Sequence, residues 1–317
     1  MKINDLLKDI KTLAITGHVK PDGDCIGSTL GLYNYVVKNY PEIDVDIYLE
    51  NPSDKFAFMG NFDKIDTRYE KEKAYDLMIC LDAATLERIG EAGKYFETAG
   101  RTVNIDHHIS NTKYADENYV EAEASSASEV LYDMLEPAMI GYDSALCIYT
   151  GIIFDTGVFK YPLTSPHTMR VAADLMGFGI PTNEIIDGIF YEKGYNENRI
   201  MGYALLNSML AFGGRVIWSY VSLEDMENFH VTSNEVDGIV PQLRLTKGVI
   251  CALFMYETAP GEYKASLRST EEFDVDGIAV KFGGGGHKRA AGFNIKGEVS
   301  ECVEKVLKEI GDNLPEA

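Results

Sequence analysis

The sequence is poor in three features that mark particular classes of protein. Its five cysteines are scattered, with no Cys-x-x-Cys pair, so we expect reduced, mostly buried thiols rather than a zinc site or a disulfide framework. The longest apolar run, 145–154, is too short to span a bilayer. Lys and Arg number 29 against 50 Asp and Glu, a net charge of −21. This balance disfavours binding along a long nucleic acid, which depends on neutralising many phosphates.

The length of 317 residues is sufficient for two domains with substantial cores. The first ten residues have the pattern of a short charged helix and not of a signal peptide. We therefore expect a soluble, cytoplasmic protein. Any polyanionic substrate should be short, or held locally by metals and a few arginines.

Through about residue 160, short apolar β-rich runs alternate with helical patterns. The predicted strands are 13–16, 45–49, 77–81 and 102–105, and the predicted helices between them are 24–39, 52–58 and 90–98. This alternation predicts a mainly parallel sheet with helices on both faces. Further helices are predicted at 128–135, 143–154, 165–176, 182–191 and 196–210.

A second pattern begins after Gly213-Gly214. It predicts strands at 215–221, 248–256, 262–267 and 290–295, and helices at 276–282 and 300–310. We predict an α/β protein with a parallel-sheet domain over 1–191, a linker helix over 192–213 and a smaller α/β domain over 214–317.

Acidic residues and histidines concentrate where the apolar runs of the first domain end. They fall in four stretches: His18-x3-Asp22-x-Asp24, Asp82, Asp106-His107-His108 and Asp155. The carboxyl ends of parallel strands border the crevice in which open α/β sheets bind ligands. Several carboxylates meeting there would repel one another unless cations neutralised them.

Imidazoles combined with carboxylates suit a hard or borderline divalent ion such as Mn²⁺. Taken alone, however, Asp22 and Asp24 are equally typical of a solvated turn or a helix cap, and Asp82 and Asp155 are typical of caps or Asx turns. Together these residues allow one bridging carboxylate and two terminal ligand sets. Metal pairs about 3.5–4 Å apart catalyse phosphoester displacement.

The adjacent histidines His107 and His108 could divide two roles, one binding a metal and the other donating to a phosphoryl oxygen or leaving group. The glycine run 283–286, followed by His287, could cradle a phosphate with backbone amides and cationic side chains, although such runs are also typical of linkers. Arg268 is a second candidate phosphate ligand, for which an ordinary surface charge is the alternative.

Taken together, these motifs resemble those of the DHH phosphoesterase superfamily in order and spacing. The resemblance rests on His18–Ser28 (H-x-x-P-D-G-D-x-x-G-S), Asp82, Asp106-His-His with Asn111, and Asp155-Thr-Gly. The stretch 283–287, followed by Ala290-Ala-Gly292, is similar to the DHH-associated C-terminal domain. Within the superfamily, the length and the Ser266-Leu-Arg-Ser269 element look most like the bacterial oligoribonuclease and 3′-phosphoadenosine-5′-phosphate phosphatase (nanoRNase) group.

The resemblance implies two Mn²⁺ ions, with Mg²⁺ as the other candidate. It assigns His18 and Asp22 to one ion, Asp24, His107 and Asp155 to the other, and Asp82 to both. It implies that His108 contacts the scissile phosphate and that Asp106 orients a ligand. The implied substrate-binding residues are Arg268, His287, Gly284, Gly285, Gly286 and Arg88.

The implied activity is hydrolysis of short RNA oligonucleotides, one nucleotide at a time, and of 3′-phosphoadenosine-5′-phosphate. A linear dinucleotide (pGpG or pApA) phosphodiesterase is the enzymatic alternative. A nucleotide-binding module without activity is a third hypothesis, which is disfavoured because all the metal ligands implied by the resemblance are present. The expected partners are therefore nucleotide substrates rather than a membrane, and the sequence leaves a homodimer open.

Overall fold

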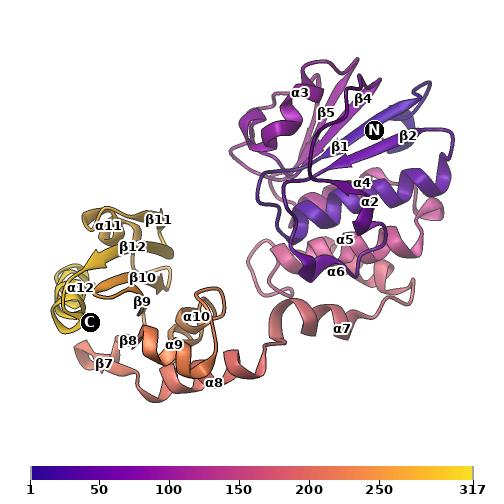
Figure 1. Ribbon diagram of the computed structural model, residues 1–317. Coiled ribbons are helices and arrows are strands. Elements are labelled where there is room, and N and C mark those ends of the chain that lie inside the picture. Colours follow the sequence, from indigo (N-terminus) through magenta and orange to yellow (C-terminus); the bar gives the residue numbers. More distant parts are fainter. Residues whose placement is uncertain (1, 316–317) are drawn as a thin grey trace. The chain divides into compact units, whose positions relative to one another are not determined.

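The computed structural model describes residues 2–315 and consists of two compact units, one ending at Glu192 and one beginning at Lys193 (Figure 1). Each unit is built on its own β-sheet with helices against it. The predicted fold class, a parallel-sheet α/β domain followed by a smaller α/β domain, is confirmed. Within the described residues, no helix is both long and apolar enough to cross a membrane.

The first unit contains a parallel sheet, which within residues 2–315 has six strands in the order β3-β2-β1-β4-β5-β6. The strands are β1 (Thr12–Thr16), β2 (Asp44–Tyr48), β3 (Ile65–Asp66), β4 (Leu77–Leu81), β5 (Thr102–Asp106) and β6 (Glu117–Val120). The direction of strand succession reverses between β1 and β4. Such a reversal opens a crevice at the carboxyl ends of the two strands.

Helices cover both faces of this sheet, as predicted. They are α1 (Ile3–Leu6), α2 (Gly23–Asn39), α3 (Gly93–Phe96), α4 (Ala127–Met134), α5 (Tyr142–Asp155), α6 (Pro166–Met176) and α7 (Thr182–Ile186). Ile15 of β1 packs in the larger core with α2, α4 and α5, whereas its neighbour Ala14 packs in a smaller core with α3. This division follows the two-residue period of a strand, which sends successive side chains to opposite faces.

Two of the predicted helices are shorter than expected. The stretch 52–58 forms only a 3₁₀ turn at Asp54–Phe56, and 90–98 divides between a 3₁₀ segment (Leu86–Ala92) and α3. Gly90 has a φ of +55° in this segment, which interrupts the helical path.

Close packing of α2 against α5 depends on two glycines. A Cβ atom on Gly27 would lie 2.6 Å from the carbonyl oxygen of Cys147, and a Cβ on Gly151 would lie 2.0 Å from Oγ of Ser128 and 2.7 Å from Oδ1 of Asp24. The two helices can therefore approach only because these positions lack side chains. The approach brings Asp24 of α2 close to the carboxyl-terminal turn of α5.

The second unit contains a mixed sheet in the order β11-β12-β10-β9-β8-β7, in which β8 and β9 are parallel and the other pairs antiparallel. Its strands are β7 (Met209–Ala211), β8 (Val216–Val221), β9 (Cys251–Ala259), β10 (Glu262–Ser269), β11 (Gly285–His287) and β12 (Ala290–Lys296). Its helices are α8 (Tyr195–Leu206), α9 (Leu223–Phe229), α10 (Ile239–Arg244), α11 (Asp276–Lys281) and α12 (Val299–Asn313).

The stretch expected as a linker helix contributes to the core of the second unit. Ile200 and Ala204 of α8 are buried with Ile217 of β8, on the sheet face that also packs against α9 and α10, while α11 and α12 cover the other face. The helical prediction for 196–210 runs too far, because α8 ends at Leu206 and β7 begins at Met209.

Candidate metal centre

The carboxyl ends of β1, β4 and β5 bring the predicted metal ligands together. His18 lies two residues beyond β1, Asp82 directly follows β4, and His107 directly follows β5. The other predicted ligands are Asp22 and Asp24 at the start of α2 and Asp155 at the end of α5. These side chains form two adjacent groups that share Asp82.

The first group contains His18, Asp22 and Asp82. Nε2 of His18 lies 3.7 Å from Oδ1 of Asp22 and 3.4 Å from Oδ2 of Asp82. Asp22 is the N-cap of α2, because its Oδ1 accepts hydrogen bonds from the backbone N–H groups of Asp24 and Cys25. The cap fixes the carboxylate beside His18.

The second group contains His107, Asp24, Asp155 and Asp82. Nε2 of His107 lies 3.2 Å from Oδ2 of Asp155, 3.6 Å from Oδ1 of Asp82 and 4.0 Å from Oδ2 of Asp24. The fully buried Asp24 also accepts hydrogen bonds from the backbone N–H groups of Ala127 and Ser128 in the first turn of α4. Asp24 thus orders the start of a second helix while facing His107.

Asp82 directs Oδ2 toward His18 and Oδ1 toward His107. Its φ of +55° places it in the left-handed region, an uncommon conformation for a residue other than glycine that often occurs at functional sites. The carboxylate is buried, and Oδ1 accepts no hydrogen bond from any described residue. A buried carboxylate oxygen without a donor is costly unless a cation compensates it.

The electrostatics of the cluster also fit divalent cations. Burial, together with the charges of Asp82 and Asp155, raises the pKa of Asp24 well above its ordinary value, and burial and Asp82 raise the pKa of Asp155. Burial opposes protonation of the two histidines, but their carboxylate neighbours outweigh it and raise the pKa of His18 to about 10 and that of His107 to about 11. Without a metal, protons offset the clustered negative charge.

The ring orientations leave Nε2 of both histidines facing the carboxylates. Nδ1 of His18 lies 2.9 Å from the Val19 carbonyl oxygen, and Nδ1 of His107 lies 3.4 Å from that of Ala124. Because a carbonyl only accepts, these contacts place the proton on Nδ1 and leave Nε2 as the donor atom for a metal. The residues present therefore fit two neighbouring divalent ions.

Arg88 lies beside this group, with Nη2 3.1 Å from Nδ1 of His18. A guanidinium only donates, so this contact requires the tautomer opposite to the one that the Val19 contact supports. The Val19 contact is the one compatible with metal binding at Nε2, which leaves the guanidinium of Arg88 available to another acceptor at the site.

Cys25 is close to the first group but is not suited to ligation. Its Sγ accepts a hydrogen bond from the His18 backbone N–H, and burial with the charges of Asp82 and Asp22 raises the pKa of its thiol well above the ordinary value. In the metal-free protein this thiol therefore stays protonated, and it contacts the His18 backbone instead of a carboxylate group of the cluster.

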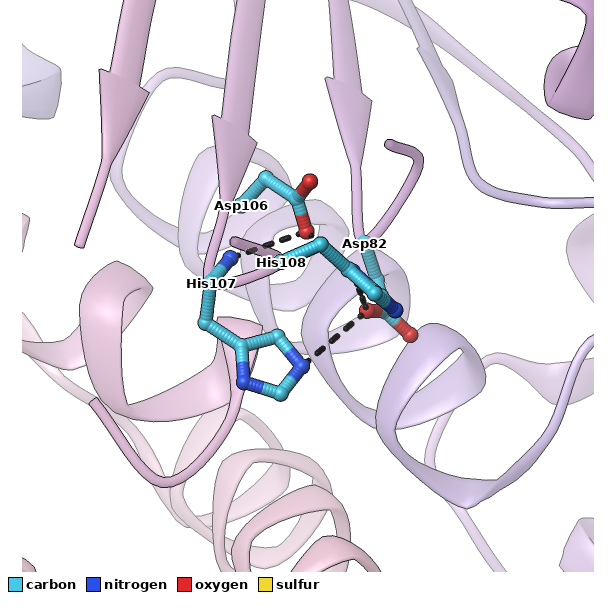
Figure 2. A group of neighbouring side chains, drawn as sticks. All are labelled: Asp82, Asp106, His107 and His108. Carbon is cyan, nitrogen blue, oxygen red and sulfur yellow. Dashed lines mark hydrogen bonds and ion pairs between the residues drawn. The ribbon is translucent and has the colours of Figure 1, made fainter. Parts of the chain in front are cut away.

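His108 and Asp106 form a hydrogen-bonded pair at the edge of the cluster (Figure 2). Nδ1 of His108 lies 2.8 Å from Oδ1 of Asp106, which also accepts from the His107 backbone N–H at 2.8 Å. Oδ2 of Asp106 accepts from Nδ2 of Asn111 at 2.5 Å. Both oxygens of Asp106 are therefore occupied, and Asp106 positions its neighbours instead of facing a metal.

The side chain of His108 is more exposed than that of His107. The side chain is 43% exposed, whereas that of His107 is 9% exposed. The hydrogen bond to Asp106 is the main cause that raises the pKa of His108. Since Nδ1 is held by Asp106, Nε2 is the ring nitrogen free to donate to a substrate.

The predicted substrate residues of the second unit lie in one row across three strands. Arg268 of β10 pairs with Ala290 of β12, which in turn pairs with His287 of β11. Residues that pair directly across strands point to the same face, so Arg268 and His287 share a face, about 10 Å apart with a small residue between them.

The glycine run differs from the predicted loop, because Gly285–His287 forms the edge strand β11. A Cβ atom on Gly284 would lie 2.2 Å from the carbonyl oxygen of Gly292, and one on Gly286 would lie 2.4 Å from that of Ala290. Close approach to β12 therefore accounts for these two glycines, whereas Gly285 has no contact closer than 3.8 Å. The packing against β12 cannot be seen in the sequence pattern.

Comparison with known proteins finds two domains in this chain. The model of the DHH family N-terminal domain matches residues 12–152, and that of the DHHA1 domain matches residues 213–315. The bifunctional oligoribonuclease and PAP phosphatase NrnA of Thermus thermophilus is 29% identical over 320 residues, which cover 99% of this chain and 94% of the relative. The Bacillus subtilis protein of the same description is 29% identical over 290 residues, covering 90% and 89% of the two chains.

Among solved structures, an exopolyphosphatase-related protein from Bacteroides fragilis matches with a TM-score of 0.84 and 26% sequence identity, over 98% of this chain and 94% of that chain. The two matched domains follow one another in the order expected from the motifs, and the first contains all the ligands of the cluster except Asp155. The chain therefore contains a DHH domain followed by a DHHA1 domain.

Proposed function

We propose that this protein is a phosphoesterase that uses two Mn²⁺ ions to hydrolyse short RNA oligonucleotides and 3′-phosphoadenosine-5′-phosphate. The observation that carries the proposal is Asp82, whose two oxygens face two different groups of histidine and carboxylate ligands. The names of the Thermus and Bacillus relatives supply the substrate classes.

In this proposal His18 and Asp22 would hold one ion, Asp24, His107 and Asp155 would hold the other, and Asp82 would contribute to both. Such a pair of ions supplies Lewis acidity toward phosphoryl oxygens and lowers the pKa of water. Imidazole and carboxylate donors suit Mn²⁺, and Mg²⁺ would accept the carboxylates more readily than the imidazoles.

His108 acts on the substrate, and Asp106 holds His108 in place. In the imidazolium form, Nδ1–H of His108 stays bonded to Asp106 and Nε2–H can donate to a phosphoryl oxygen as negative charge develops there. Arg88, next to His18, adds a second cationic donor in the first unit. These two groups would offset charge on the phosphate from the protein side.

Arg268 and His287 bind a phosphate or terminal group of the substrate in the second unit, with the backbone of Gly284, Gly285 and Gly286 alongside. Support comes from their shared face on neighbouring strands. The net charge of −21 limits the length of the substrate, because a phosphate tail beyond these few cations meets a predominantly acidic protein.

The proposal is tested by incubating the protein with Mn²⁺ and a panel that contains RNA oligomers of increasing length, 3′-phosphoadenosine-5′-phosphate and the linear dinucleotides pGpG and pApA. We expect mononucleotides from the short oligomers and loss of one phosphate from the bisphosphate. Turnover of the dinucleotides alone would favour the dinucleotide phosphodiesterase alternative. Binding without any product would favour a nucleotide-binding module.

A further inference from the structure

Asn104 is a buried polar residue that the proposed function leaves without a role. It lies in β5, two residues before Asp106, and its side chain is inaccessible to solvent. A buried amide must be fully hydrogen-bonded to be tolerated, and a fully satisfied amide fixes the geometry of everything it contacts. The partners of Asn104 belong to two different motifs of the metal centre.

The amide nitrogen of Asn104 holds the backbone around Asp82. Nδ2 lies 3.3 Å from the carbonyl oxygens of both Cys80 and Ala83, the residues on either side of Leu81 and Asp82. A third partner is the hydroxyl of Tyr114, at 3.1 Å. Because Asp82 has a φ of +55°, the turn needs such external support to stay in its left-handed conformation.

The amide oxygen of Asn104 leads in the other direction, toward His108. Oδ1 accepts a hydrogen bond from Nδ2 of Asn111 at 2.7 Å, and the same Nδ2 donates to Oδ2 of Asp106 at 2.5 Å. Asp106 in turn accepts from Nδ1 of His108 at 2.8 Å. An uninterrupted series of hydrogen bonds therefore runs from the Asp82 turn to the His108 ring.

We propose that Asn104 and Asn111 form an amide bridge that positions the Asp82 turn and the His108 ring relative to each other. Neither amide contacts substrate in this role, so both are positioning residues. The inference rests on the proposed function, because it assigns the bridge to the reaction in which His108 takes part. An amide suits the position because one group donates toward the Asp82 turn and accepts from Asn111 at the same time.

The first test measures coupling to His108. Asn104→Ala and Asn111→Ala are each made in the parent and in His108→Ala, and turnover of an RNA trimer is measured at saturating Mn²⁺. In the parent, each change should lower kcat by roughly tenfold or more and leave KM within about twofold, since the loss is one of transition-state geometry. In His108→Ala the same changes should have almost no further effect on kcat. If each change lowered kcat by the same factor in His108→Ala as in the parent, the amides would be general structural residues and the proposal would be overturned.

The matched control is Asn118→Ala. Asn118 is a partly buried asparagine of the neighbouring strand β6, and within residues 2–315 its amide bonds only to the backbone of Ala115. This variant should keep the parent kcat. If Asn104→Ala does not fold, Asn111→Ala carries the test, because Asn111 lies in a partly exposed loop and breaks the same bridge.

The second test does not depend on activity. In metal-free protein labelled with ¹⁵N-histidine, the Nδ1 proton of His108 should give a downfield, slowly exchanging resonance, because Asp106 accepts from it. We expect faster exchange in Asn104→Ala and Asn111→Ala but not in Asn118→Ala. An unchanged resonance in both bridge variants contradicts the proposal.

The two tests separate failure of the bridge from failure of the proposed function. A parent protein without turnover on any member of the substrate panel, but with a resonance that responds to both bridge variants, would overturn the function and retain the bridge. An active parent with an unresponsive resonance would overturn only the bridge. Titration of Mn²⁺ by calorimetry completes the comparison, since Asn104→Ala, which frees the Asp82 turn, should weaken binding more than Asn111→Ala.

Discussion

Oδ1 of Asp82 lies 3.6 Å from Nε2 of His107 and, in the part of the chain that the structure describes, accepts no hydrogen bond although it is buried. Oδ2 of the same carboxylate lies 3.4 Å from Nε2 of His18. One side chain thus faces both ligand groups, and the proposed two-ion site depends on it.

Asp82→Asn should abolish binding of both ions at concentrations that saturate the parent, because the uncharged amide leaves each ligand group without its shared carboxylate. Asparagine tolerates the left-handed conformation, so the turn itself should persist. Metal analysis after gel filtration should show about two Mn²⁺ in the parent and fewer than one in the variant, and turnover should fall by roughly a hundredfold or more. Two retained ions would contradict the shared role of Asp82.

The two adjacent histidines should respond differently to truncation. His108→Ala should lower kcat by roughly a hundredfold while keeping both ions, since its Nδ1 binds Asp106 and its side chain is partly exposed. His107→Ala should lose an ion. Metal content and kcat measured on the same samples decide between them, and loss of an ion from His108→Ala would show that the roles are exchanged.

Metal binding should release protons, and the metal-free protein should lose stability as pH rises. In the folded protein the pKa values of His18 and His107 are raised to about 10 and 11, so protonation of these histidines stabilises the fold. The stabilisation is complete below pH 6.5, the ordinary histidine pKa, and is lost as pH rises toward 10 and 11. The raised pKa values of Asp24 and Asp155 act in the same direction. Melting temperatures from pH 6.5 to 10 should fall without metal.

Saturating Mn²⁺ should remove most of this dependence, because the ligands must be deprotonated to bind. Calorimetry at pH 8 in buffers of different ionisation enthalpy should report about two protons released on full occupancy, and about one fewer in His107→Ala. Absence of proton release would mean that the histidines are already neutral or are not ligands.

Gly151→Ala should be strongly destabilising and should impair metal binding, because its Cβ would lie 2.0 Å from Oγ of Ser128 and 2.7 Å from Oδ1 of Asp24. A cost of about 1–3 kcal/mol in the free energy of unfolding is expected for such overpacking. Gly202→Ala in helix α8 is the matched control, with nothing within 4 Å of the added Cβ. It should stabilise by about 0.5–1 kcal/mol, as alanine favours helix. Denaturant unfolding of both variants measures the difference.

Arg268→Ala should raise KM for RNA oligomers of all lengths and leave hydrolysis of a small generic phosphodiester unchanged, because the small ester lacks the nucleotide groups that Arg268 is proposed to bind. Lys296→Ala is the control, since Lys296 is an exposed cation on β12 that pairs with Glu262. In the parent, kcat/KM should be highest for oligomers of roughly two to five nucleotides and fall with length. Equal kcat/KM on a trimer and a long single strand would show that the acidity does not limit length.

Much of the first unit could be predicted because its central strands are buried on both faces. Leu77–Leu81 is an unbroken apolar run, typical of a parallel strand, and Asp82 stands out directly after it. The edge strands β3 and β6 carry no such signal, because they are short and only partly buried. Helices α9 and α10, seven and six residues long, are also too short for a reliable periodicity.

The residues that sequence reasoning missed act through tertiary contacts. Gly151 lies in a helical pattern, where a glycine has several explanations, and only the packing of α5 against α2 and α4 reveals its role. Asn104 sits inside a predicted strand, where its partners from other motifs cannot be anticipated. Candidate metal ligands could be predicted from their residue types and positions. The residues that hold them in place could not, because they come from distant parts of the chain.

The most direct measurement is the initial rate of mononucleotide release from an RNA trimer as Mn²⁺ is titrated into concentrated metal-free protein. At protein concentrations far above the dissociation constants, added metal is fully bound and its amount sets the occupancy. If the site needs both ions around Asp82, the rate should stay low up to about one equivalent and rise steeply toward two. A rate that increases linearly from the first addition and reaches its maximum at one equivalent, or no mononucleotide at any metal content, would contradict the account.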